Sequence, residues 1–119
     1  MKRILSLLAI LMAVSTFTSA QNKNKIITED IPVSGVCDEC KTRIEKAAYI
    51  PGVKRAEWDE KTKNLKVSFK ASKVSLEEIE QSVARTGHDA GTIKAADSAY
   101  NQLPSCCAYK EKGIEHHAH

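Results

Sequence analysis

The sequence lacks an excess of either charge, a long apolar run and any recognisable set of hydrolytic residues. Its 119 residues carry 18 Lys and Arg against 15 Asp and Glu, which gives no electrostatic case for nucleic acid as the main partner. The chain has room for one domain, which excludes an α/β barrel or a full dinucleotide-binding fold. No Ser-His-Asp set or paired carboxylates indicate hydrolysis, because the acidic residues follow predicted helix faces and turns.

Residues 1–20 predict a cleaved secretory signal peptide. A basic start precedes the apolar stretch of residues 4–14, and small residues lead to a cleavage site after Ala20. This stretch is about eleven residues long, whereas a membrane-spanning helix needs about 20. We therefore expect a periplasmic or secreted protein that is not inserted in a membrane once the signal is removed.

The first half of the mature chain predicts a strand, a helix and a second strand. Alternating apolar residues indicate a strand over residues 27–33, and Pro32 places it at a sheet edge or marks its end. The helix carries apolar residues at i, i+4, i+7 and i+8 from Cys40, and Pro51 with Gly52 ends it. Residues 53–58 then predict a strand.

The second half repeats this order. Apolar residues alternate with polar ones over residues 65–69, Ser75 and Glu78 predict a capping box before a helix at Leu76, and residues 90–94 predict a short last strand. The order β-α-β-β-α-β predicts an α+β, ferredoxin-like fold, in which a four-stranded antiparallel sheet carries two helices on one face. We expect this domain over residues 21–94 and a C-terminal extension over 95–119.

Four cysteines in an exported chain normally indicate two disulfides. Cys37 and Cys40, however, lie in a loop and the first turn of the predicted helix, where N–H groups and the helix dipole favour thiolates. Asp38 and Glu39 between them partly oppose this effect. Two thiolates at this spacing can converge on a soft ion such as Cu(I) or Hg(II). A local disulfide or a pair of buried thiols is the alternative.

This segment resembles the heavy-metal-associated domain family, which includes copper chaperones, metal-binding repeats of copper-transporting ATPases and periplasmic mercury-binding proteins. The resemblance covers roughly residues 25–94 and rests on Val33-x-Gly35, Cys37-x-x-Cys40, residues 43–46, Pro51-Gly52-Val53, residues 61–63, Leu65-x-Val67-x-Phe69 and Gly87. It implies a non-enzymatic carrier or scavenger with Cys37 and Cys40 as metal ligands. Such a carrier passes Cu(I) by thiolate exchange to a metal-transporting membrane protein or another metal-binding domain.

Two alternatives to a Cu(I) carrier stay open. A mercury-binding protein would use the same two thiolates, and Zn(II) would prefer four ligands, which only the tail cysteines or histidines could complete. A thiol–disulfide oxidoreductase is the enzymatic alternative, but the aromatic residue and Pro common around redox C-x-x-C pairs are missing. The loop also departs from the family, since Val36 stands where a Met is usual and the loop is one residue shorter.

His88 follows the second predicted helix, in a loop that the resemblance places near the metal loop. Its neutral imidazole could supply a third ligand, and a surface histidine is the alternative. Lys41, Arg43 and Lys46 form a solvated helix face or, as the resemblance suggests, a basic docking surface for an acidic partner.

The extension predicts a short helix over residues 95–103, stopped by Pro104 and followed by Cys106 and Cys107. Adjacent cysteines rarely bond to each other without strain, so each needs a partner elsewhere. They could complete a site with Cys37 and Cys40, bind a second metal with the terminal histidines, resolve the first pair by disulfide exchange, or staple the tail by a disulfide. The terminal histidines capture metal weakly or form a disordered polar end: His116, His117 and His119.

Overall fold

The computed structural model describes residues 25–111. Its elements are β1 (Ile26–Pro32), α1 (Asp38–Ala48), β2 (Val53–Trp58), β3 (Asn64–Lys70), α2 (Leu76–Ala84), α3 (Asp97–Tyr100) and the 3-10 helix η1 (Ser105–Cys107). Within the described range, none of the helices has the length and apolar character needed to cross a membrane.

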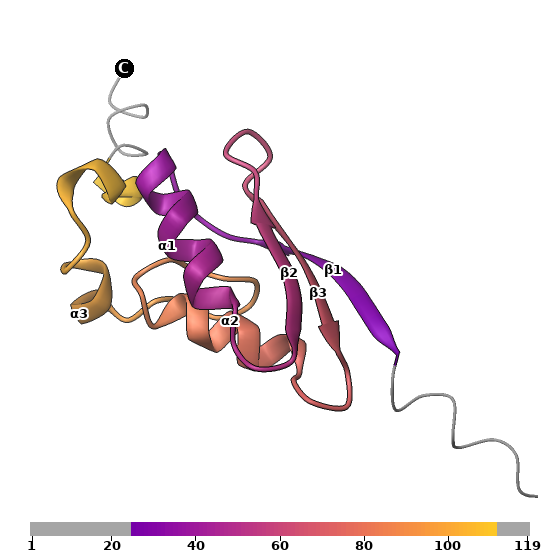
Figure 1. Ribbon diagram of the computed structural model, residues 1–119. Coiled ribbons are helices and arrows are strands. Elements are labelled where there is room, and N and C mark those ends of the chain that lie inside the picture. The colour runs from indigo at the N-terminus through magenta and orange to yellow at the C-terminus, as the bar shows by residue number, and fades with distance from the viewer. Residues whose placement is uncertain (1–24, 112–119) are drawn as a thin grey trace, which may run out of the picture.

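The three strands form an antiparallel sheet in the order β1-β3-β2, with α1 and α2 together on one face (Figure 1). The period-two alternation of β3 places its apolar side chains toward the helices, and the same rule applies to β2. The buried core under the helices includes Ile31, Leu65, Val67, Ile79 and Val83. The predicted ferredoxin-like arrangement with both helices on one face is confirmed, and β1 lies at a sheet edge as Pro32 indicated.

The prediction of a fourth strand over residues 90–94 is wrong, because the described part of the chain has only isolated bridges there. Ala90 makes a single antiparallel bridge to Val33, beside β1. The backbone then turns back on itself, because Ala90 and Ile93 exchange two hydrogen bonds of 2.9 Å. Gly91 makes this reversal possible with a φ of 58°, a left-handed conformation that other residues adopt only at a cost. The chain thus leaves the sheet edge after one bridge.

Helix α2 begins where its capping box predicted. The Ser75 hydroxyl accepts a hydrogen bond from the Glu78 N–H at 3.2 Å, and the Glu78 carboxylate accepts one from the Ser75 N–H at 2.8 Å. The Ser82 hydroxyl donates to the carbonyl oxygen of Ala47 at 2.6 Å, which joins α2 to the end of α1. The two helices are therefore tied together on the sheet.

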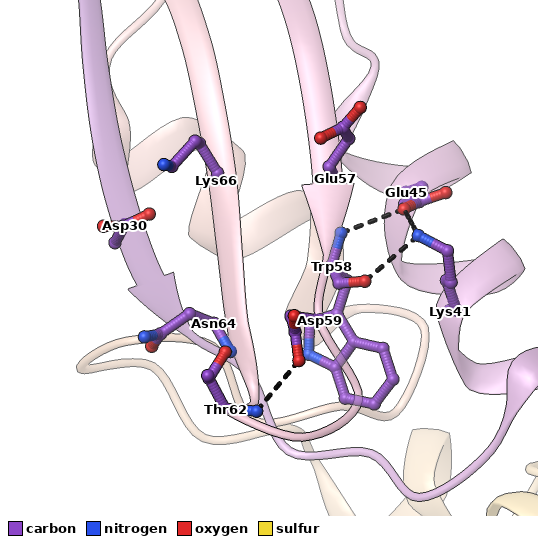
Figure 2. Close-up of a pocket in the computed structure, with 9 residues that line it drawn as sticks. All are labelled: Asp30, Lys41, Glu45, Glu57, Trp58, Asp59, Thr62, Asn64 and Lys66. Carbon is purple, nitrogen blue, oxygen red and sulfur yellow. Dashed lines mark hydrogen bonds and ion pairs between the residues drawn. The ribbon is translucent and has the colours of Figure 1, made fainter.

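Helix α1 is tied to the end of β2 by Lys41 and Glu45 (Figure 2). The Glu45 carboxylate accepts a hydrogen bond from the Trp58 N–H at 2.9 Å, the Lys41 ammonium donates to the Trp58 carbonyl at 3.0 Å, and the two side chains pair with each other. These residues line a cavity of about 540 Å³ that contains carboxylates and ammonium groups but no cysteine. The contacts of Lys41 and Glu45 with Trp58 therefore hold α1 against the end of β2.

The C-terminal extension folds back onto the domain. Helix α3 is shorter than the predicted helix, with Tyr100 buried and Ala96 exposed. Gly87, with a φ of 106°, lies so close to the extension that an added Cβ would come within 2.8 Å of the Ala99 carbonyl oxygen. The Tyr109 hydroxyl donates to the Gly87 carbonyl at 2.9 Å. This docking brings η1 beside the N-terminal end of α1 (Figure 1).

Candidate metal centre

Cys37 and Cys40 meet at the N-terminus of α1. Cys37 is the N-cap residue in an extended conformation, and Cys40 follows in the first helical turn, so the helix geometry itself brings the two side chains together. Their Sγ atoms lie 3.3 Å apart. Cys40 is fully buried, whereas Cys37 is half-buried and accessible at the surface. The two residues predicted as a pair from the sequence are therefore adjacent in space.

Cys107 joins this pair from η1. Its Sγ atom lies 3.5 Å from that of Cys37, and the sulfurs of Cys37, Cys40 and Cys107 all fall within 4.8 Å of one another. Cys107 is fully buried, and the Arg43 guanidinium donates to its sulfur at 3.3 Å. No disulfide links the described cysteines. We call these three residues the soft cluster.

The thiols of the soft cluster differ in acidity. Burial raises the pKa of Cys37, but hydrogen bonds from the Cys40 backbone and from the side chains of Cys40 and Cys107 outweigh it and lower the pKa overall. Burial is also the main reason that the pKa of Cys107 is raised, followed by its hydrogen bonds to the other sulfurs. Cys37 therefore loses its proton more readily than Cys107 does.

Cys106 has a different environment from its neighbour. Its thiol donates to the Glu39 carboxylate at 2.9 Å, and its sulfur lies 3.8 Å from that of Cys107. This hydrogen bond to Glu39 is the main reason that the pKa of Cys106 is raised. Glu39, Cys106 and Cys107 form a second group of ligand atoms within 4.8 Å, which we call the mixed cluster.

From the sequence, Glu39 is expected only to oppose thiolate formation through its charge. One sequence signal indicates that Glu39 and Arg43 can act together on a neighbouring segment, because they are one helical turn apart and share a face of α1. What the sequence could not show is that the tail lies against this face. The structure places Cys106 beside Glu39 and Cys107 beside Arg43.

His88 is a fully buried residue, so the surface alternative is wrong. Its Nδ1 lies 2.7 Å from the Ser34 carbonyl oxygen, which can only accept, so Nδ1 carries the proton of the neutral ring. Nε2 then presents a lone pair, and it is buried without a hydrogen-bond partner in the described part of the chain. Burial, together with the charge of Arg43, lowers the pKa of His88 against the opposing effect of Ser34.

The ring of His88 stacks on Tyr109 at 5.5 Å between centroids. Among residues 25–111, the groups of three close ligand atoms do not include His88. Its contacts therefore support a role in seating the tail, and its metal-binding role stays a prediction. The terminal histidines and the predicted signal peptide lie outside the described residues.

Two of the three residues of the predicted basic docking surface have partners within the fold, and a partner for this surface stays a prediction. Lys41 pairs with Glu45 and the end of β2, and Arg43 is turned toward Cys107, which leaves Lys46 exposed. Lys41 and Arg43 thus also support the fold and the cysteine cluster.

Comparison with protein families decides the class of this fold. Residues 31–89 match the heavy-metal-associated domain. The chain carries a heavy-metal-associated domain. Its matched segment contains Cys37 and Cys40, whereas Cys106 and Cys107 lie beyond it in the extension.

Several solved structures resemble the chain. The CopZ metallochaperone is 27% identical with a TM-score of 0.52, covering 54% of this chain and 98% of its own. A copper binding domain from HMA7, a P-type ATPase, is 25% identical with a TM-score of 0.51, covering 53% and 88%. Oxidized MerP from Ralstonia metallidurans, at 23% identity and a TM-score of 0.54 over 56% and 96%, shows a likeness of fold. No curated protein sequence matches the chain significantly.

Proposed function

We propose that the protein is an exported carrier of a soft metal ion, and that its cargo is Cu(I). The observation that carries this proposal is the soft cluster, in which three sulfurs lie within 4.8 Å of one another. Thiolate ligands select soft ions such as Cu(I) over hard cations. The heavy-metal-associated domain and its likeness to a metallochaperone and a copper binding domain support the same function.

The ligand set favours Cu(I) over the other candidate ions. Cys37 and Cys40 supply the first two thiolates and Cys107 the third, which suits the low coordination number of Cu(I). Hg(II) is the alternative cargo for the same two helix thiolates. Zn(II) prefers four ligands in a closed site, and the soft cluster offers three.

The burial of the three sulfurs suggests how the ion is delivered. Cys37 is half-buried, whereas Cys40 and Cys107 are fully buried, so a partner's thiolate reaches the ion from the Cys37 side. Each new sulfur–metal bond replaces one existing bond, and no electron is transferred. The receiving partner in this proposal is a metal-transporting membrane protein or another metal-binding domain, and export rests on the signal peptide expected over residues 1–20.

A competition titration tests the function. Reduced protein without the signal peptide is titrated with Cu(I) against a Cu(I) chelator, and the result is compared with a Cys37→Ser/Cys40→Ser variant. We expect an affinity loss greater than about 100-fold, because loss of even an outer-shell partner of a metal commonly costs 10–100-fold. His88→Ala, measured alongside, shows whether the buried Nε2 contributes. Unchanged affinity in the double variant contradicts the proposal.

A further inference from the structure

One face of α1 holds both tail cysteines, although they are adjacent in the sequence. Glu39 accepts a hydrogen bond from Cys106 at 2.9 Å, and Arg43, one turn further along, donates to Cys107 at 3.3 Å. The soft cluster uses Cys107 and leaves Cys106 and Glu39 outside it. Their arrangement therefore needs its own explanation.

The geometry of the mixed cluster points to a metal site. We propose that Glu39, Cys106 and Cys107 bind a second ion, a borderline divalent cation of the Zn(II) class. In a tetrahedral site with Zn–S bonds of about 2.3 Å, two sulfurs lie about 3.8 Å apart. The sulfurs of Cys106 and Cys107 are 3.8 Å apart. A carboxylate oxygen and a thiolate sulfur bound to the same ion lie about 3.5 Å apart. The Glu39 oxygen now lies 2.9 Å from the Cys106 sulfur, so it moves away by roughly half an ångström when the ion binds.

The chemistry of the ligands separates this ion from Cu(I). Two thiolates and a carboxylate oxygen form the mixed donor set that suits Zn(II), whereas Cu(I) prefers sulfur alone. Glu39 is exposed and Cys106 half-buried, so water can reach the ion and complete four-coordination. Two nearby charges also act on the ion. The carboxylate of Asp38 favours a cation, whereas the guanidinium of Arg43 repels a cation and offsets the negative charge of the Cys107 thiolate.

Cys107 belongs to both clusters, so an ion in one changes the ligand available to the other. Cys37 and Cys40 belong only to the soft cluster, while Glu39 and Cys106 belong only to the mixed cluster. The second site is therefore separable from the proposed Cu(I) site by substitution.

The experiment uses the reduced mature chain in a background that removes competing ligands. This background carries Cys37→Ser and Cys40→Ser together with alanine at His116, His117 and His119, and it is titrated with Zn(II) against a chromophoric zinc chelator. We expect one Zn(II) per chain. Glu39→Gln and Cys106→Ser each weaken binding by about 10–100-fold or more. Asp38→Asn is the matched control, since it removes a neighbouring exposed carboxylate from the same helical turn, and it leaves the affinity nearly unchanged.

Two results overturn the second site. One is the absence of Zn(II) binding in this background, with the fold verified by circular dichroism. The other is an equal loss of Zn(II) affinity in Glu39→Gln and Asp38→Asn. That result would mean that Glu39 acts only through its negative charge and is not a ligand. Because Cys40 is buried, its replacement can disturb folding, and in that case Zn(II) is titrated into metal-free chains that retain Cys40 and carry Cys37→Ser with the three histidine substitutions. There Glu39→Gln, and not Asp38→Asn, weakens the binding of the added Zn(II).

Discussion

The two cysteine pairs of this protein are built in opposite ways. Cys37 and Cys40 are three residues apart at a helix N-terminus, so a single helical turn brings their sulfurs to 3.3 Å. Cys106 and Cys107 are adjacent, and each contacts a different residue: Cys106 lies against Glu39 of α1, and Cys107 lies near Cys37, the N-cap of α1. The first pair is a product of local geometry, whereas the second depends on the docking of a distant segment.

The difference extends to thiol chemistry. The hydrogen bonds around Cys37 outweigh the effect of its burial and lower its pKa, whereas the carboxylate of Glu39 raises the pKa of Cys106. Residue type alone therefore does not set reactivity, since the neighbouring donors and acceptors decide which form of the thiol is stable. Despite their adjacency, Cys107 belongs to both clusters, whereas Cys106 belongs only to the mixed cluster.

Among tests of this comparison, the largest effect is expected from substituting the tail cysteines one at a time. Cys107→Ser lowers Cu(I) affinity by about 10–100-fold, because it removes a ligand from the soft cluster. Cys106→Ser is the matched control and leaves Cu(I) affinity nearly unchanged, since its sulfur contacts Glu39 instead. The measurement is the chelator competition titration on both variants. Equal losses would break the comparison by showing that both tail cysteines serve the same ion.

A smaller effect is expected from disturbing the docking of the tail. Gly87→Ala puts a Cβ within 2.8 Å of the Ala99 carbonyl oxygen and forces a residue with a side chain into a left-handed conformation. We expect a loss of about 1–2 kcal/mol in the free energy of unfolding. Denaturant unfolding measures it, with the exposed Ser98→Ala as control. A variant as stable as the parent would show that the tail contributes little to the fold.

The smallest effect concerns the rates at which Cys37 and Cys106 are alkylated. Because the pKa of Cys37 is lowered and that of Cys106 is raised, Cys37 carries more thiolate at neutral pH and is alkylated first. Both side chains are half-buried, so access is similar. As pH rises, alkylation of Cys37 reaches its maximum rate at a lower pH than that of Cys106. Peptide mass spectrometry of the metal-free protein after brief iodoacetamide treatment measures both rates.

Glu39→Gln sharpens this comparison. Removing the carboxylate removes the main cause of the raised pKa of Cys106, so its alkylation becomes faster while that of Cys37 changes little. If Cys106 were alkylated before Cys37 in the parent chain, the opposite pKa shifts of these two residues would be wrong.

Most of the fold followed from local signals. The alternation of β3, the capping box of α2 and the start of α1 at the Cys37–Cys40 loop all predicted elements that the structure contains. The last strand did not follow, because a hydrogen-bonded turn at Ala90 competes with sheet pairing, and periodicity over five residues cannot distinguish the two.

The sequence by itself determined the heavy-metal-associated order of elements and the meeting of Cys37 with Cys40, since both depend on interactions within a few residues. Only the tertiary structure decided the partners of Cys106 and Cys107 and the burial of His88. Those contacts join segments more than 50 residues apart along the chain, such as Ser34 with His88 and Glu39 with Cys106. The physical reason is that these contacts form only when segments distant in the chain pack together, and no local pattern specifies that packing. The contacts of Cys106 and Cys107 in addition require the extension to pack on Gly87 and α1.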